Sequence, residues 1–187
     1  GAEAVDPGAD VLLLGEMGIG NSTVAAVQAA ATFGGTAADW VGPGTGAVGD
    51  ILDNKLCAVT AGMARHRPVT ALQTLAAFGG REQAAICGAV LRARRLGIPV
   101  ILDGFICTAA ASVLTRDDPQ ALAHCLIGHQ SAEPGHRRLI AALGKQPVLS
   151  LDMRLGEGSG AAVALMVLRG AIACHNGMAT FAEAGIA

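Results

Sequence analysis

The chain has 187 residues, of which 52% are hydrophobic and 15% are charged, and this balance excludes an intrinsically disordered protein. Aromatic residues make up only 3%, so we expect a core built mainly from Ala, Val, Leu and Ile. The formal net charge of −2 gives no general attraction for nucleic acid or anionic membranes, and no apolar run reaches the length of a membrane span. We therefore expect a globular protein with neither nucleic acid nor a membrane as its partner.

The cysteines and the N-terminal residues bear on the cellular compartment and on the extent of the chain. The five cysteines lie mostly in apolar surroundings without C-x-x-C spacing, which is typical of reduced thiols in a cytoplasmic protein. Residues 1–10 are small and acidic, so they lack the pattern of a signal peptide. Since the first predicted strand follows at once and no initiator Met is present, we expect residues 1–187 to form a single α/β domain that is a fragment of a longer protein.

The first half of the chain predicts one strand followed by several helices. Residues 11–14, Val-Leu-Leu-Leu, are a continuous apolar run of the kind that forms a strand buried on both faces. A glycine-rich loop follows, and Asn21 or Ser22 is a suitable N-cap for an Ala-rich helix that ends near Thr32. The elements expected next are a long loop over 33–49, helices over 50–64, 69–77 and 81–96, and a C-cap at Gly97.

The second half predicts three further strands that alternate with helices. The strands are expected at 100–102, 125–127 and 147–151, the last of them buried. The helices are expected over 108–114, from Asp117 onward, over 134–143 and, as a buried segment, over 161–168. This alternation indicates an α/β fold with a doubly wound, mainly parallel sheet and right-handed crossovers, flanked by helices.

Three of the predicted strand ends carry one acidic residue beside a glycine. These residues are Glu16, Asp103 and Glu157. Because the carboxyl ends of parallel strands meet at one edge of a sheet, where open α/β sheets bind their ligands, the three side chains are expected to converge. The alternation of elements alone therefore predicts a single site at this edge.

Glu157 is the carboxylate of the stretch Leu-Gly-Glu-Gly-Ser-Gly over 155–160. Glycines at a strand-to-helix turn let the backbone approach a substrate closely and present N–H groups at a helix N-terminus. A carboxylate among them, flanked by apolar elements, would have a raised pKa and would suit a general base. The alternative, which the stretch alone slightly favours, is a Glu that caps a helix in a tight glycine turn.

Several other reaction classes lack their motifs. Residues 44–49 spell G-x-G-x-x-G, but no strand precedes them and no acidic residue follows at the distance that a ribose requires, which disfavours an NAD-linked dehydrogenase. The five histidines show no metal-ligand spacing, so we expect neither a metal nor a cofactor. Ser159 has no evident His partner and no G-x-S-x-G motif is present, which disfavours a serine hydrolase.

Glycine loops at the predicted helix starts are able to bind a phosphate through their backbone N–H groups. Lys55, one of two lysines, lies close in sequence to the glycines at 44–46 and would be the counter-charge, although a solvated surface lysine is about equally plausible. Ser131 and Glu133 before Pro134 favour helix capping, and Ser131 also suits a phosphate ligand.

Six stretches of the sequence, in order, resemble one family: the nicotinate-nucleotide–dimethylbenzimidazole phosphoribosyltransferases of cobalamin biosynthesis. They are residues 15–21, 44–46, 103–105, 131–136, 155–160 and 178–183. The resemblance extends over nearly the whole chain but corresponds to the C-terminal half of the family. The N-terminal half, which supplies much of the benzimidazole pocket in relatives, has no counterpart here.

This resemblance implies a Rossmann-like α/β fold, a homodimer and a glycosyltransferase reaction without a cofactor. Phosphoribose would move from nicotinate mononucleotide to 5,6-dimethylbenzimidazole, giving α-ribazole 5′-phosphate and nicotinate. Glu157 would be the general base that removes the benzimidazole N–H proton. The residues that would line the nucleotide site are Glu16, Met17, Gly18, Gly44, Gly46, Lys55, Asp103, Gly104, Phe105 and Ser131, with glycine N–H groups and Lys55 on the phosphate. The alternative is a non-catalytic nucleotide- or phosphate-binding domain, or a truncated inactive form.

Overall fold

A parallel sheet with the strand order β1-β2-β3-β4 organises the chain, which we describe from a computed structural model over residues 1–44 and 46–186. The strands are β1 (Leu12–Leu14), β2 (Val100–Leu102), β3 (Cys125–His129) and β4 (Pro147–Leu149). Leu13 pairs with Ile101, and Ile101 pairs with Leu126, so the three chain segments are aligned at their carboxyl ends. The α/β fold with a parallel sheet, expected from the alternation of elements, is confirmed.

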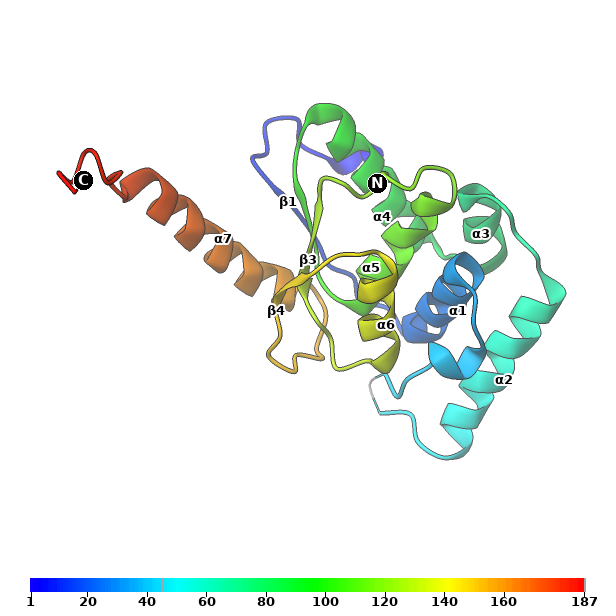
Figure 1. Cartoon of the computed structure of the whole chain (residues 1–187). Helices are drawn as coiled ribbons and strands as arrows, with labels where there is room; N and C mark the ends of the chain where they lie inside the picture. Colours follow the sequence, from blue (N-terminus) through cyan, green and yellow to red (C-terminus); the bar gives the residue numbers. More distant parts are fainter. Residues whose placement is uncertain (45, 187) are drawn as a thin grey trace.

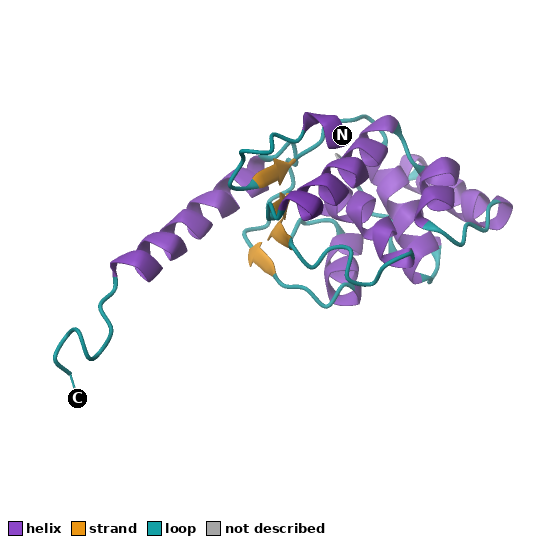
Figure 2. Ribbon diagram, turned by 90° about the horizontal axis from the view of Figure 1, so that it is seen from above, coloured by secondary structure: helices purple, strands orange, loops and turns teal. Residues whose placement is uncertain are grey.

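Helices cover the two faces of this sheet unequally. Figure 2 shows the strands between one long helix, α7, and the mass of the other helices. The helices are α1 (Asn21–Phe33), α2 (Asp50–Arg65), α3 (Ala71–Phe78), α4 (Arg81–Leu96), α5 (Phe105–Ser112), α6 (Pro134–Ala142) and α7 (Ser159–Gly177), with short 3-10 turns at Ala2–Ala4, Ala37–Asp39 and Val113–Arg116. No helix within the described ranges is both long and apolar enough to cross a membrane.

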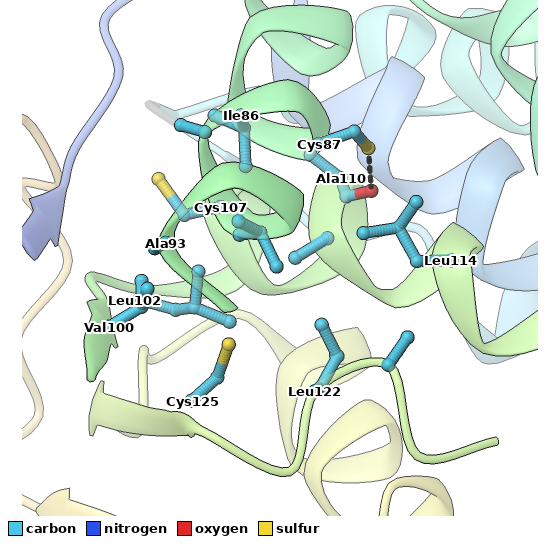
Figure 3. Close-up of a cluster of buried hydrophobic side chains, with 14 of the residues drawn as sticks. Ile86, Cys87, Ala93, Val100, Leu102, Cys107, Ala110, Leu114, Leu122 and Cys125 are labelled. Atoms are coloured by element: carbon cyan, nitrogen blue, oxygen red, sulfur yellow. Dashed lines mark hydrogen bonds between the residues drawn. The ribbon is translucent and has the colours of Figure 1, made fainter. Parts of the chain in front are cut away.

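Strand β2 separates two parts of the core. Its side chains alternate between the faces, so Val100 and Leu102 contact the side of α4 and α5, while Ile101 contacts α7. Figure 3 shows Val100 and Leu102 among Ile86, Cys107 and Cys125, with small residues between the larger ones. The expected core of Ala, Val, Leu and Ile is confirmed, because side chains of these types make up most of the buried apolar residues.

Helix α7 differs from the prediction of a buried helix over 161–168. Only Gly160, Ala161 and Ala164 of α7 are buried, and Val163 and Met166 are 41% and 54% exposed. Figure 1 shows why: α7 begins against the sheet and then runs away from the rest of the chain. An apolar sequence predicted burial here, whereas the described residues leave most of the helix surface uncovered.

The outer strands are also less buried than the sequence predicts. All residues of β1 are half-buried, and β4 carries Val148 at 36% exposure. These two strands lie at the edges of the sheet, and only the start of α7 covers the face opposite α4 and α5. The expectation of a strand buried on both faces is met by β2, which is fully buried, and not by β1 or β4.

Two local predictions are wrong for identifiable reasons. The helix expected from Asp117 is a series of turns, because Asp117 accepts the backbone N–H of Ala71 and Asp118 accepts that of Gln120. The N-cap of α1 is Gly20, with φ 88°, rather than Asn21 or Ser22. The C-cap at Gly97 is confirmed, since this residue has φ 73° and its N–H closes the last turn of α4.

Candidate active site

A cavity of about 300 Å³ opens at the carboxyl edge of the sheet. Its walls come from the loops after β1, β2 and β3 and from the loop between β4 and α7. Glu16, Asp103 and Glu157 all line this cavity, so the predicted convergence of three acidic residues is confirmed. The arrangement follows from the parallel strands, which direct each of these loops to the same edge.

Most of the residues that the sequence assigned to a nucleotide site line this cavity. They are Glu16, Met17, Gly18, Gly44, Asp103, Gly104, Phe105 and Ser131. Gly46 and Lys55 are not among the lining residues, and Thr45, in the same Gly-Thr-Gly stretch, lies outside the described residues. The lining residues that sequence reasoning missed are Ile19, Gly20, Ser22, Ile106, Cys107, His129, Glu133, Arg154, Leu155 and Gly156.

Lys55 lies directly behind the cavity wall. Its half-buried ammonium group donates to the carbonyl of Gly42 over 2.6 Å and to the hydroxyl of Ser22 over 3.1 Å, and Ser22 does line the cavity. Burial lowers the pKa of Lys55, and the nearby Glu133 carboxylate opposes that shift. A solvated surface lysine, the alternative left open by the sequence, is therefore not what the structure contains.

Glu133 occupies the backbone donor that was expected to take a phosphate. Its Oε1 accepts the N–H of Gly44 over 2.7 Å, across 89 positions of the sequence. Glu133 is the N-cap residue of α6, but its side chain makes no capping hydrogen bond there, so the capping interpretation of this residue is wrong. The guanidinium of Arg154 donates to the carbonyl of Gly44 over 3.0 Å and adds a positive charge to the same wall.

Three helices begin at this cavity, which favours a negatively charged ligand. The lining residues include the starts of α1 at Gly20 and Ser22, of α5 at Phe105, and the Gly156-Glu157 turn before α7. Helix N-termini carry a partial positive charge and present backbone N–H groups that have no intrahelical partner. Together with Lys55 and Arg154, they make the cavity suited to a phosphate.

Glu157 is exposed and has φ 58°, a left-handed conformation that residues other than glycine adopt rarely. The N-cap of α7 is the next residue, Gly158, with no capping hydrogen bond from a side chain. The helix-capping alternative thus finds no support in the described residues. The described residues also do not bury the Glu157 side chain.

Asp103 is 2% exposed and uses both carboxylate oxygens within the protein. Oδ1 accepts the N–H of Ala161 over 2.8 Å and Oδ2 accepts that of Gly158 over 3.0 Å. Burial would raise the pKa of Asp103, but the neighbouring His129 ring and these two N–H groups outweigh it and hold the pKa below its ordinary value. Asp103 is therefore an ionised anchor for the start of α7.

Glu16 is half-buried and lines the same cavity. Burial raises its pKa, and the negative charges of Glu82, Asp103 and Glu157 add to that shift, while a hydrogen bond from the Asn21 amide opposes it. A carboxylate with a raised pKa was expected at Glu157 from the sequence. Glu16 is a further carboxylate of this cavity, and its own pKa is raised.

Two buried histidines lie at this site: His129 lines the cavity, and His136 contacts the lining residue Ser131. His136 is fully buried, and its Nδ1 accepts the N–H of Ser131 over 2.9 Å while Nε2 lies 3.2 Å from the Thr108 hydroxyl. Burial, together with the neighbouring His129, lowers the pKa of His136 to about 3, so the ring is neutral. The hydrogen bond from the Ser131 N–H to His136 fixes the backbone of Ser131, a lining residue that follows β3.

Comparison with known proteins assigns the chain to a protein family. The sequence matches the phosphoribosyltransferase family over residues 1–186. It is 59% identical over 186 residues to the nicotinate-nucleotide–dimethylbenzimidazole phosphoribosyltransferase of Rhodobacter capsulatus, and 55% identical over 188 residues to that of Brucella canis. In both cases the match covers 100% of this chain and 56% of the relative, so the chain spans about half the length of these curated relatives.

A solved structure agrees with the sequence comparison. The crystal structure of CobT from Thermus thermophilus superposes on this chain with a TM-score of 0.90 at 44% sequence identity. The superposition covers 96% of this chain and 54% of the other one. The fold described above is therefore that of the matching half of a known enzyme structure.

Proposed function

Because this chain belongs to the phosphoribosyltransferase family, with relatives named nicotinate-nucleotide–dimethylbenzimidazole phosphoribosyltransferase, we propose that it carries out the transfer step of that reaction. The donor is nicotinate mononucleotide, the acceptor is 5,6-dimethylbenzimidazole, and the products are α-ribazole 5′-phosphate and nicotinate. The observation that carries the proposal is the cavity in which three helix starts and two carboxylates, Glu16 and Glu157, meet.

The nucleotide lies with its phosphate at the helix starts of α1 and α5. The backbone N–H groups of Gly18, Gly104 and their neighbours hold the phosphate, and Lys55 and Arg154 balance its charge. The remaining members of the proposed nucleotide site are Glu16, Met17, Gly44, Gly46, Phe105 and Ser131, together with Asp103, which shapes the wall because both of its oxygens accept backbone N–H groups. The N–H of Gly44 donates to the Glu133 carboxylate in this structure. It contacts the phosphate only if Glu133 moves away and the ligand takes its place.

The transfer proceeds by direct displacement at the ribose C1′. The unprotonated ring nitrogen of the benzimidazole forms a bond to C1′, and the bond from C1′ to the pyridinium nitrogen breaks, with its electron pair passing to nicotinate. The Glu157 carboxylate takes the proton from the other benzimidazole nitrogen. Nicotinate leaves with a neutral ring, so no strong general acid is needed. Attack from the opposite face inverts the anomeric centre and gives the α product.

We further propose that residues 1–187 are a single-domain C-terminal portion of a longer cytoplasmic protein. The chain spans about half of its relatives, and Glu157 is exposed, which supports a remaining part that closes over the acceptor base. Enclosure of this kind would raise the pKa of a carboxylate and strengthen its action as a base.

The long apolar surface of α7 supports a homodimer. Its exposed residues include Val163, Met166, Val167 and Ile172, each at least 41% exposed, and a contiguous apolar patch on a surface helix is typical of an interface. The change Met166→Lys should shift the mass measured by sedimentation towards the monomer. The control is Leu91→Lys in α4, which alters an apolar residue of similar exposure (45%) on the other side of the sheet and should leave the mass unchanged.

The substitution Glu157→Gln tests the catalytic assignment. A positioned general base contributes about 10²–10⁴-fold, so kcat should fall on that scale while binding of nicotinate mononucleotide persists. The matched control is Asp152→Asn, because Asp152 lies in the same loop, is exposed and has a similar φ of 53°, but does not line the cavity. Normal turnover by Glu157→Gln would remove Glu157 from the mechanism.

A non-catalytic nucleotide-binding domain is the second candidate, favoured by the Glu133 contact that already fills one backbone donor. Calorimetry with nicotinate mononucleotide and an assay of nicotinate release with both substrates present separate the two. Binding without release by the 187-residue chain, and release by the longer protein, would show that the acceptor pocket lies outside this chain. Binding without release by both would support the second candidate.

A further inference from the structure

We propose that Asp103 is a positioning residue for catalysis: its buried carboxylate fixes the backbone beside Glu157 and so determines where the Glu157 carboxylate lies. Asp103 follows β2, the fully buried strand of the sheet, which gives it a rigid base. Glu157 belongs to the loop after β4, an edge strand that is only half-buried. The inference rests on the proposed role of Glu157 as the general base.

Asp103 is linked to Glu157 through the backbone of the next residue, Gly158. Oδ2 of Asp103 accepts the N–H of Gly158, the residue immediately after Glu157, over 3.0 Å. Oδ1 accepts the N–H of Ala161 in the first turn of α7 over 2.8 Å. Because the two oxygens hold donors on both sides of the helix start, the Asp103 carboxylate restrains the direction of α7 as well as its distance from β2.

A second contact involves the same peptide. A methyl group placed on Gly15, the residue before Glu16, would lie 2.4 Å from the nitrogen of Gly158 and 3.0 Å from the carbonyl carbon of Glu157. The backbone after β1 therefore touches the backbone after β4 with no room for a side chain. Gly158 is therefore held by two contacts, the hydrogen bond to Asp103 and the close packing against Gly15.

The backbone conformation of Glu157 gives this restraint its importance. Gly156, Glu157 and Gly158 have φ values of 78°, 58° and 82°, so three successive residues have a positive φ. A glutamate prefers other regions of the Ramachandran map, and it keeps such a conformation only where its surroundings over-determine it. Without the Asp103 carboxylate, the Glu157 peptide is free to relax and its side chain to leave the cavity.

Asp103 is poorly suited to act on the substrate itself. It is 2% exposed, both of its oxygens accept backbone N–H groups, and His129 Nδ1 lies 3.5 Å from Oδ1 on its remaining side. Its action therefore passes through the backbone to Glu157, although the residue lies at the cavity wall.

The test is a double-mutant cycle between Asp103→Asn and Glu157→Gln. The amide introduced by Asp103→Asn keeps the size of the side chain but turns one acceptor into a donor that faces a backbone N–H. We expect kcat to fall by about 10- to 100-fold, as for a small displacement of a reacting group, with the KM for nicotinate mononucleotide within about 2-fold of the parent. In the Glu157→Gln background, Asp103→Asn should have no further effect on kcat.

The control is Asp118→Asn, which makes the same exchange at a carboxylate that also accepts a backbone N–H, that of Gln120, but on the exposed surface away from the cavity, where its other oxygen pairs with Arg94. Amide resonances provide a readout that does not depend on turnover. In ¹H–¹⁵N spectra, the signals of Gly158 and Ala161 should move on Asp103→Asn, whereas Asp118→Asn should leave them in place. If Asp103→Asn does not fold, Asp103→Glu, which keeps the charge and displaces it by one methylene, should show the same loss of kcat.

The outcomes separate this inference from the function on which it rests. If Glu157→Gln turns over normally, the base assignment fails whatever Asp103 does. If Glu157→Gln is impaired but Asp103→Asn is not, the positioning role alone is overturned. An equal loss from Asp103→Asn in both backgrounds, or a loss confined to KM, would also overturn it, because either result would mean that Asp103 acts independently of Glu157.

Discussion

The ring of His129 lies directly against the backbone of Gly160: a methyl group on Gly160 would be 1.8 Å from Nδ1. His129 is 1% exposed and is held from its other side by Gly104, where a methyl group would be 2.7 Å from Cε1. The start of α7 therefore approaches β3 as closely as the absence of two side chains permits. This contact sets the position of the loop that carries Glu157.

The change Gly160→Ala should destabilise the protein by about 2–3 kcal/mol, because the new methyl group overlaps a fully buried ring that has no space to move. Chemical denaturation measures the change. The control is Gly170→Ala in the same helix, where nothing lies within 4 Å of the new methyl group, and helix propensity should instead add about 0.5–1 kcal/mol. Equal effects at both positions would contradict the close contact.

The change Glu16→Gln should stabilise the protein at neutral pH. Since the folded-state pKa of Glu16 is raised above the ordinary value of 4.5, the folded state holds this proton more tightly than the unfolded state does. The free energy of unfolding contributed by Glu16 therefore falls as the pH rises from 4.5 through the folded-state pKa. Gln is neutral and retains an acceptor for the Asn21 amide. The variant therefore avoids the decrease in the free energy of unfolding that the charged Glu16 causes at neutral pH.

Urea denaturation at several pH values checks the Glu16 prediction. The stability difference between Glu16→Gln and the parent should be largest near pH 7 and should shrink towards about pH 4. Glu3→Gln, at an exposed position on the N-terminal turn, is the control and should not reproduce this dependence. A Glu16 variant that is less stable than the parent at neutral pH would contradict the burial argument.

The buried His136 should make the protein sensitive to mild acid. Its pKa of about 3 in the folded state lies below the ordinary value of 6.5, so below pH 6.5 the unfolded chain takes up a proton that the folded chain refuses. The free energy of unfolding should fall as the pH drops from 6.5 towards 3. His124, whose pKa is also lowered, mainly by burial, contributes in the same direction.

The variant His136→Gln isolates this contribution. It should be less stable than the parent at neutral pH, because it disturbs the bonds to Ser131 and Thr108, but its stability should change less between about pH 6.5 and 5. Urea midpoints over this range provide the measurement. An unchanged slope would show that His136 does not account for the acid sensitivity.

The change Lys55→Met should raise the KM for nicotinate mononucleotide by about 10-fold, since a hydrogen bond to a charged group contributes about 1.5–3 kcal/mol. Part of the effect would come from the Gly42 and Ser22 contacts, which shape the wall. The other lysine of the chain is a matched control: Lys145 also donates to a backbone carbonyl, that of Cys125, but Cys125 does not line the cavity, whereas Ser22, which accepts from Lys55, does. Lys145→Met should leave KM unchanged.

The acidic residues of the site were predictable because their positions follow from a rule of topology. Glu16, Asp103 and Glu157 each follow a predicted strand, and parallel strands bring such residues to one edge in any order of strands. His129 ends β3 at the same edge, so the same rule identifies it as well. The glycine loops and Lys55 were proposed for a phosphate from their positions in the sequence, and the family resemblance added Met17 and Phe105, whose roles no spacing rule could assign.

The features that sequence reasoning missed depend on contacts between distant segments. The Glu133 carboxylate meets Gly44 across 89 residues, and neither residue carries a local pattern that identifies the other. The exposure of α7 was also missed because it depends on distant contacts. The sequence of an apolar helix does not show whether its own domain or another surface covers it. The half-buried β1 and β4 reflect the order of strands in the sheet, which the alternation of elements leaves open.

The hydrogen bonds that Asp103 accepts from the start of α7 also have a consequence for the order of folding. The ribosome releases β2 with Asp103 long before the start of α7, which supplies the N–H groups that this carboxylate accepts. Until then the ionised Asp103 has to remain hydrated, and the sheet face that carries Ile101 has to remain exposed to solvent. The docking of α7 therefore completes the core and the catalytic edge in one late, long-range step, of the kind that slows folding.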